Sequence, residues 1–161
     1  MRVSNPGVLA ALLALTACSS AAEDAKETAD RLTGEAAGEA ADNPQCKLFT
    51  SDELAIYLGK PVNGPANAAG GTGCQWEARD EQGFVQIQVV RAADSNPPSG
   101  AQGFREVAGV GQGGYVAPGM SGWDAGAIQG DKAFIVSVEN EGATPENAVA
   151  LLKETLSRSA R

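Results

Sequence analysis

The chain has 161 residues, a net charge of −8 and no histidine. Without histidine it cannot contain a Ser-His-Asp or Cys-His nucleophile, or a zinc or copper site built on imidazole. It also has no cluster of basic residues, so we expect no binding to nucleic acid, which requires Lys and Arg contacts to phosphates. We find no candidate catalytic residue, metal ligand or cofactor site, and the length suffices for one domain.

Residues 1–17 have the pattern of an export signal. Arg2 lies near the N-terminus, and the apolar run from 8 to 15 is too short to span a bilayer. Leu15-Thr16-Ala17-Cys18 resembles the lipobox of bacterial lipoproteins, which implies cleavage after Ala17 and acylation of Cys18. An ordinary secretory signal with a cysteine near its cleavage site by chance is the alternative.

Residues 18–44 are predicted to be a lipidated, flexible tether. They are rich in alanine, glycine and acids, and Leu32 is their only large apolar side chain. Alanine buries too little area to offset the ordering of the backbone, and Gly34 and Gly38 weaken a helix further. A partner-binding helix, the alternative, would need larger apolar residues at coiled-coil spacing. We therefore predict a single domain over residues 45–161.

Cys46 and Cys74 are the two cysteines that remain once Cys18 is acylated. In an exported protein an even pair favours a disulfide. Two free thiols, or half of a metal site that lacks its usual partners, are the alternatives. The bridge would stabilise the fold by about 3.6 kcal/mol on the chain-entropy account.

The first half of the domain predicts a helix followed by a hairpin. Thr50 and Glu53 form the T-x-x-E pattern of a capping box, so Thr50 should begin a helix that ends at Gly59. After a glycine-rich loop, residues 74–79 alternate with period two and predict a strand, and residues 84–91 predict the return strand.

The second half predicts a hairpin followed by a helix. A short strand is expected at 114–117, and residues 123–129 and 132–140 alternate around Gly130-Asp131, a hairpin turn signal. Thr144-Pro145 should begin the last helix. Its apolar stripe consists of Ala148, Leu151, Leu152, Thr155 and Leu156.

These elements predict an α+β fold. A helix and a hairpin are followed by a hairpin and a helix, an order that suggests one antiparallel sheet with both helices on the same face. We expect an antiparallel sheet of about four to six strands, with the N-terminal and the C-terminal helix packed on one face.

The segment Gly109-Val110-Gly111-Gln112-Gly113-Gly114 has the spacing G-x-G-x-x-G. A dinucleotide site needs a helix to follow at once, so that the helix N-terminus meets the pyrophosphate. Pro118 prevents a long helix here, and export would remove the protein from the cytoplasmic nucleotide pool. We interpret the motif as a glycine-permitted turn that leads into a strand.

Paired acids are the only side chains that could support catalysis. Two carboxylates can hydrolyse a glycoside without histidine. One pair lies in the first turn of a predicted helix, where the helix dipole stabilises acids. The other pairs lie in a turn or near a strand end, so we expect each pair to be solvated. These carboxylate oxygens could also bind calcium, but no loop has the regular acid spacing of an EF-hand. The pairs are Asp52/Glu53, Asp80/Glu81 and Glu139/Glu141.

Trp76 and Trp123 could line a ligand groove or pack in the core. Each lies in an alternating strand, which favours the core. Tyr57 and Tyr115 have the same two alternatives.

Cys18, the segment from Cys46 to Leu54 with its T-x-x-E helix, and Cys74-Gln75-Trp76 together resemble a family of small bacterial lipoproteins of unknown function. That family is common in actinobacteria, and the segment from Gly109 to Tyr115 is similar to its glycine-rich turn. The resemblance covers about residues 45–156. It implies a surface lipoprotein with a Cys46–Cys74 bridge and assigns no activity.

We therefore expect an exported lipoprotein, anchored through Cys18 to the bacterial cell membrane or outer membrane, with its domain outside the cytoplasm. The domain would be a non-enzymatic binding or accessory module for an envelope protein or a small apolar ligand, without a cofactor. The alternatives are a histidine-free carboxylate hydrolase that acts on cell-wall glycans, and a passive structural or antigenic surface protein.

Overall fold

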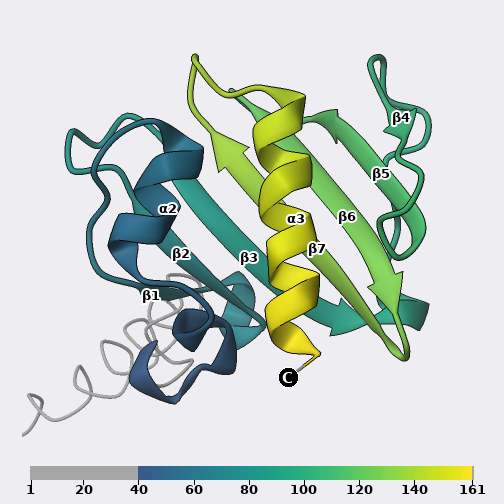
Figure 1. Ribbon diagram of the computed structural model, residues 1–161, viewed down its shortest axis with the longest axis horizontal. Helices are drawn as coiled ribbons and strands as arrows, with labels where there is room; N and C mark the ends of the chain where they lie inside the picture. The colour runs from purple at the N-terminus through teal and green to yellow at the C-terminus, as the bar shows by residue number, and fades with distance from the viewer. Residues whose placement is uncertain (1–39, 161) are drawn as a thin grey trace, which may run out of the picture.

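The computed structural model describes residues 40–160, which fold around a seven-stranded antiparallel sheet (Figure 1). The spatial order of the strands is β1, β2, β3, β7, β6, β5, β4. Antiparallel pairing and the α+β class are confirmed. The bounds are β1 (Ala66–Ala68), β2 (Gly73–Glu77), β3 (Phe84–Arg91), β4 (Arg105–Glu106), β5 (Gln112–Pro118), β6 (Trp123–Gln129) and β7 (Lys132–Glu139).

Alternating side chains determine which face of the sheet is buried. In the central pair of strands, Val85 lies opposite Val138 and Ile87 lies opposite Val136, and none of the four is accessible to solvent. Trp76 on β2 lies opposite Val85 and continues the same layer. The faces expected from the alternation are therefore confirmed for these strands.

Helix α2 (Ser51–Leu58) begins at the predicted capping box. The amide of Glu53 donates to Thr50 Oγ1 at 3.3 Å, and the amide of Thr50 donates to the Glu53 carboxylate at 2.8 Å. The helix ends at Gly59, whose φ of +78° is the left-handed conformation that glycine adopts without strain.

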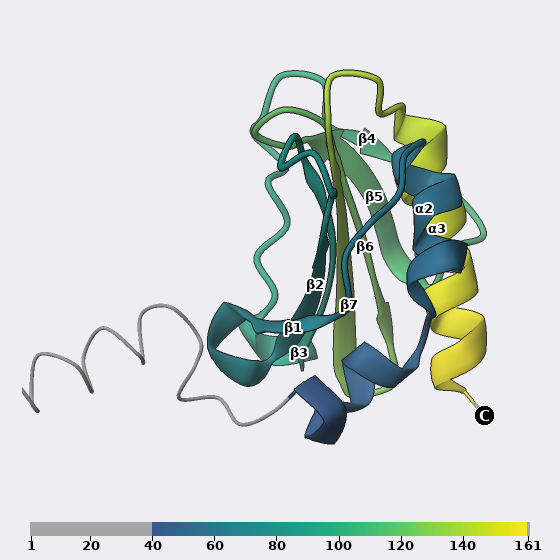
Figure 2. The ribbon, with the colours of Figure 1, turned by 90° about the vertical axis from the view of Figure 1, so that its left-hand side faces the viewer.

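Helix α3 (Pro145–Ser159) begins after Thr144, whose hydroxyl accepts from the amide of Asn147 at 3.2 Å. All five residues of the predicted apolar stripe are buried. The helix packs on β5, β6 and β7, whereas α2 contacts β3, β7 and α3. Figure 2 shows both helices on the same side of the sheet.

The sheet has seven strands rather than the four to six predicted. The additional strands are the two edges, β1 with three residues and β4 with two. Strands this short show no alternation in the sequence, and β1 lies within the segment predicted as a glycine-rich loop. Short edges also leave few unpaired backbone groups for another chain to join.

The two ends of the molecule are built from different elements (Figures 1 and 2). At the base lie two short 3₁₀ helices, η2 (Ala40–Asp42) and η3 (Pro44–Lys47), together with the C-terminal end of α3 and the β6–β7 turn. At the apex lie the C-terminal end of α2, the β5–β6 turn and the β7–α3 loop. The described chain thus enters the domain at the base. Within the segment 40–44, which composition assigned to the tether, Ala40 packs against the core and Asn43 hydrogen-bonds to β1 and β2.

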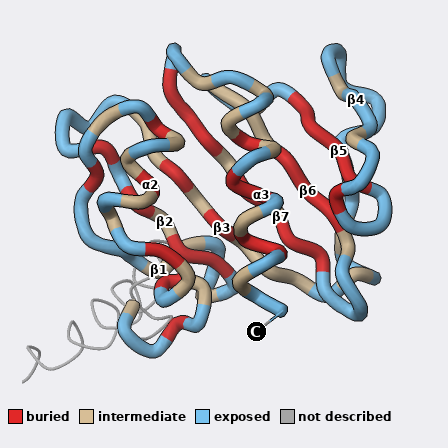
Figure 3. Tube along the Cα trace, viewed as in Figure 1, coloured by how far each residue is buried: buried red, intermediate tan, exposed pale blue. Residues whose placement is uncertain are grey.

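The face of the sheet away from the helices is crossed by the segment between β3 and β4 (Figure 2). Phe104, at the end of that segment, stacks on Tyr115 with 5.6 Å between ring centroids. Figure 3 shows the resulting distribution: buried residues follow the central strands, and exposed residues gather on β4 and on the loops at both ends.

Candidate functional site

An open furrow follows α3 on the side away from α2. It consists of two hollows that share Lys153, one of about 500 Å³ toward the apex and one of about 470 Å³ toward the base. One wall is formed by α3 and the following residue, Ala160, and the other by the segment 105–111, which contains β4 and the start of the glycine-rich turn. We call this feature the α3 furrow.

The furrow exists because two helices do not cover a seven-stranded sheet. Helix α3 lies over β5, β6 and β7, and α2 packs against the other flank of α3. Beyond α3 the sheet continues to β4, and within residues 40–160 no further helix covers that end. The last strands therefore leave a channel open beside α3.

The floor of the furrow is apolar. Val110, Val116 and Leu156 are buried there, and Val107 and Val149 are half-buried beside the core. Covering such partly exposed apolar surface is favourable by about 25 cal/mol per Å². The floor can therefore bind the apolar part of a ligand.

Glycine-rich backbone forms the wall opposite the C-terminal half of α3. Gly109 and Gly111 have φ values of +74° and +57°. A Cβ on Gly111 would lie 2.8 Å from Ala127 Cβ and 2.8 Å from the Ile128 carbonyl oxygen, so only glycine permits this close approach to β6. Because β5 starts directly afterwards, at Gln112, the interpretation of the motif as a turn into a strand is confirmed.

The charges of the furrow are separated along its length. Glu106 and Glu146 line the apex-side hollow together with Arg105, whose guanidinium lies 5.8 Å from the centre of the Trp123 ring. Lys153 lies where the two hollows meet; it is exposed and forms no ion pair with any described residue. The middle of the furrow thus has a cation without a partner.

Two further hollows, of about 540 Å³ at the base and about 600 Å³ at the apex, each contain a cation that is already paired; the base hollow also has the exposed Lys132, next to Asp131. At the apex, Lys60 Nζ lies 3.0 Å from the Asp80 carboxylate. At the base, Arg158 Nη2 lies 2.7 Å from Glu53 Oε1. A ligand there would meet an existing ion pair or, at Lys132, a neighbouring acid that lines the same hollow, whereas Lys153 lies over an apolar floor. We therefore take the α3 furrow as the candidate site.

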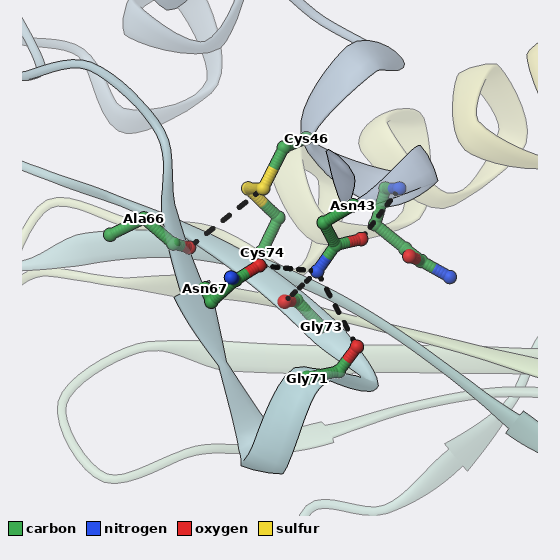
Figure 4. The surroundings of a disulfide bond; sticks show 8 residues. Asn43, Cys46, Ala66, Asn67, Gly71, Gly73 and Cys74 are labelled. Carbon is green, nitrogen blue, oxygen red and sulfur yellow. Dashed lines mark hydrogen bonds between the residues drawn. A yellow bond between two sulfur atoms is a disulfide. The ribbon is translucent and has the colours of Figure 1, made fainter. Parts of the chain in front are cut away.

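Cys46 and Cys74 form the predicted disulfide, with 5.1 Å between their Cα atoms (Figure 4). Both residues are buried, so the bond is structural rather than accessible to exchange. It joins η3 to β2 and so fixes the start of the described chain to the sheet.

Asn43 lies beside the disulfide and is only 6% exposed (Figure 4). Its Nδ2 donates to Asn67 Oδ1 and to the Gly73 carbonyl, both at 2.8 Å. Its Oδ1 accepts from the amide of Gln45 at 2.9 Å. We call Asn43 and the Cys46–Cys74 bond the base clasp. The contacts of Asn43 with β1 and β2 could not be predicted from the sequence, because those partners are far away in the chain.

Two of the predicted acidic pairs contribute one carboxylate each to an ion pair. Glu53 accepts from Arg158 and from the Thr50 amide, and these contacts lower its pKa to about 2. The hydrogen bond from Lys60 lowers the pKa of Asp80. Both pairs lie at the surface, as expected, and their paired carboxylates maintain contacts between elements.

Glu139 corrects the expectation that the third pair is solvated. Its side chain is 2% exposed, and its carboxylate accepts from the amides of Met120 and Ser121, at 3.2 and 2.6 Å. Gly119 also leaves room for it, because a Cβ there would lie 1.8 Å from Oε1. The carboxylate holds the β5–β6 turn, a contact between distant segments that the sequence pattern did not reveal, whereas Glu141 is exposed.

Asp124 is a second acid on the sheet face away from the helices. Ser137 Oγ donates to its Oδ1 at 2.5 Å, and burial raises its pKa. Its carboxylate also helps raise the pKa of Tyr115, after the larger effect of burial. The carboxylate of Glu139 is close enough to raise the pKa of Asp124 further, but it is engaged by the amides of Met120 and Ser121 and is not free to act with Asp124.

The aromatic residues divide between core and periphery. Trp76 is inaccessible and Tyr115 is 5% exposed, which confirms the core prediction for both. Trp123 is half-buried under Arg105 at the edge of the furrow, and Tyr57 packs edge-on against Phe49 with 6.5 Å between ring centroids. Trp123 therefore packs against the core and lies under Arg105, which lines the candidate site.

The export signal and Cys18 lie outside the described residues. Neither α2 nor α3, nor any other helix between residues 40 and 160, is long and apolar enough to cross a bilayer. The same part of the chain contains no group of three or more acids and cysteines that could hold a metal ion. No model of a known protein family matches the chain, and a search of curated proteins finds no match.

Sequence reasoning did not find the furrow, although one signal was present. Val149 and Lys153 are separated by one helical turn and lie outside the apolar stripe of α3. A valine beside the stripe can mark a second surface. The opposite wall of the furrow could not be anticipated, because it includes the two-residue strand β4.

Proposed function

We propose that this chain is an exported lipoprotein, held on a membrane through Cys18, whose domain binds a small apolar ligand without catalysing a reaction. The lipobox supports the anchor. The Cys46–Cys74 bond supports an oxidising compartment, where disulfides persist. The spacing of the cysteines, with the C-x-W strand, supports membership of the actinobacterial lipoprotein family that the chain resembles.

The α3 furrow is the observation that carries the binding role. Its two hollows, about 500 and 470 Å³, have the size of ordinary small-molecule sites. Its floor is apolar, and the half-buried Val107 and Val149 gain burial when a ligand covers them. An envelope protein as the partner would need a larger continuous surface than this narrow channel provides.

The position of the furrow suits a ligand that comes from the membrane. The described chain enters at the base, where the anchor would be attached, and the base clasp fixes that attachment. The base-side hollow is lined by Ala160 and Gln129, close to the same end. The base-side hollow therefore lies at the end of the domain from which the tether leaves.

The anchor is tested by labelling cells with a fatty-acid analogue. Wild-type protein should carry the label and stay in the membrane fraction after a high-salt wash, because several acyl chains hold it. The Cys18→Ser variant should be unlabelled and released. An unlabelled wild-type protein would contradict the anchor.

The furrow is tested with the neutral probe N-phenyl-1-naphthylamine, whose fluorescence rises in an apolar site. Full-length protein with Cys18→Ser provides the unanchored background. Adding Ala150→Phe should fill the apex-side hollow and abolish the signal, whereas Ala101→Phe, at an exposed position outside the furrow, should leave it unchanged. Equal binding by both variants would contradict the furrow as the site. Failure of the background protein to bind would favour the passive surface protein.

A further inference from the structure

We propose that the ligand of the α3 furrow is a single-chain anionic amphiphile of the fatty-acid type, with its anionic group at Lys153 and its chain in the apex-side hollow. This inference rests on the proposed function and specifies the class of ligand. It is carried by the position of one lysine and by the different linings of the two hollows.

Lys153 is placed to bind an anion. It is the residue that the two hollows share, and it is exposed and unpaired among the described residues. Glu154, the next residue, is bound to Arg158 at 2.8 Å and therefore does not neutralise it. An ammonium group with its donors free attracts a carboxylate or phosphate through charge-assisted hydrogen bonds.

The linings of the hollows indicate where the apolar chain lies. The apex-side hollow is bounded by Val107, Val116, Val149 and Ala150, which present methyl groups. The base-side hollow has a mixed lining: Val110 and Leu156 are apolar, but glycine backbone, Gln129 and Ser157 lie beside them and can accommodate a polar group and its water. From Lys153 to Pro145, α3 spans about 12 Å, room for one chain of medium length.

The acids at the apex exclude the opposite orientation. Glu106 and Glu146 line the far end of the apex-side hollow and would repel an anion there, although Arg105 is nearby. Arg105 lies over the Trp123 ring, and the two acids that line the same hollow offset its charge for an incoming anion. Lys153 is therefore the position at which an anionic group meets a cation without acids beside it.

The test compares three amphiphiles of equal chain length by calorimetry below their aggregation concentrations. These are dodecanoate, neutral 1-dodecanol and cationic dodecyltrimethylammonium. The protein is the full-length chain with Cys18→Ser. It should bind dodecanoate most tightly and the cationic probe least.

Substitutions of Lys153 then isolate the charge. Lys153→Gln should weaken dodecanoate binding about fivefold to tenfold, the effect of losing one partly solvated ion pair, and should leave dodecanol binding unchanged. Lys153→Arg should restore most of the affinity for dodecanoate. Lys47→Gln, at an exposed lysine outside the furrow, should have no effect on either probe.

The outcomes separate this inference from the proposed function. Three results would overturn the anionic ligand and leave binding in the furrow intact. They are equal affinity for dodecanoate and dodecanol, an equal loss of affinity for both in Lys153→Gln, and tightest binding of the cationic probe. If the background protein binds none of the probes, both are overturned.

Discussion

The base clasp and the α3 furrow are two regions of the same sandwich that treat their polar groups in opposite ways. At the base, Asn43 is buried with its amide donors and acceptor all engaged, and a disulfide lies next to it. In the furrow, Lys153 forms no ion pair with any residue from 40 to 160, and Val149 is only half-buried. Fully satisfied polar groups stabilise and specify a structure, whereas unsatisfied ones remain available to a ligand. The base clasp therefore stabilises the fold, and the α3 furrow is the region that we propose for binding.

Arg158 extends the base region across the helices. Its Nη1 donates to the Leu48 carbonyl at 2.7 Å, its Nη2 pairs with Glu53, and its guanidinium lies 4.1 Å from the centre of the Phe49 ring. The C-terminal end of α3 is thus connected to the segment that follows the clasp and to the start of α2. Lys153, a little over one turn earlier on the same helix, makes no such connection.

The largest expected effect is the loss of the disulfide. Reduction, or the variant Cys74→Ser, should lower the free energy of unfolding by about 2 to 5 kcal/mol, because the bond constrains the unfolded chain. Urea denaturation with and without reductant measures this. An unchanged midpoint after confirmed reduction would show that the base does not depend on the bond.

Removing the buried amide of the clasp should have the next largest effect. Asn43→Ala leaves the Gly73 carbonyl and the Gln45 amide without their partner, at a cost of about 1 to 3 kcal/mol. Asn63→Ala, at an exposed position, is the control and should change stability little. An equal loss of unfolding free energy in the two variants would show that the hydrogen bonds of Asn43 do not stabilise the base.

Acid should weaken the ion pair between Glu53 and Arg158. The pKa of Glu53 is lowered from 4.5 to about 2, so the pair stabilises the fold above the unfolded-state pKa and this contribution is lost as the pH falls from about 5 to 2. Both side chains are partly solvated, which limits the effect to about 1 kcal/mol. The difference in unfolding free energy between wild type and Glu53→Gln should shrink over that interval. A difference that stays constant with pH would contradict the pair.

The smallest effect on stability is expected in the furrow. Lys153→Gln removes no contact and should change the free energy of unfolding by less than about 0.5 kcal/mol, while Leu152→Ala, at the buried neighbour, should cost about 2 to 5 kcal/mol. Thermal unfolding of the two variants provides the contrast. A large loss for Lys153→Gln would mean that the furrow is part of the structural framework.

Local signals in the sequence were sufficient for much of the fold. The capping box at Thr50, the stripe of α3 and the alternation of β3 and β7 each depend on residues a few positions apart, and the structure confirms all three. The features that could not be predicted join distant segments. The carboxylate of Glu139 binds the turn at 119–122, and Arg158 binds Glu53 far back in the sequence.

The same distinction explains why the candidate site was found only in the structure. The glycine-rich turn could be read as a turn from its spacing, but its role as a wall requires α3 beside it. The edge strand β4 is too short to predict, and it places Arg105 over Trp123. A furrow between a helix and a two-residue strand has no periodicity of its own.

Hydrogen exchange of the full-length Cys18→Ser protein, with and without saturating dodecanoate, is the most direct test of the furrow as the binding site. Protection should increase in the segment 105–113 and in α3, while the base clasp and the apex loops stay unchanged. Protection centred on the separate hollow around Gly59 and Asn140, outside the furrow, or on the sheet face that carries Asp124, would contradict binding in the furrow.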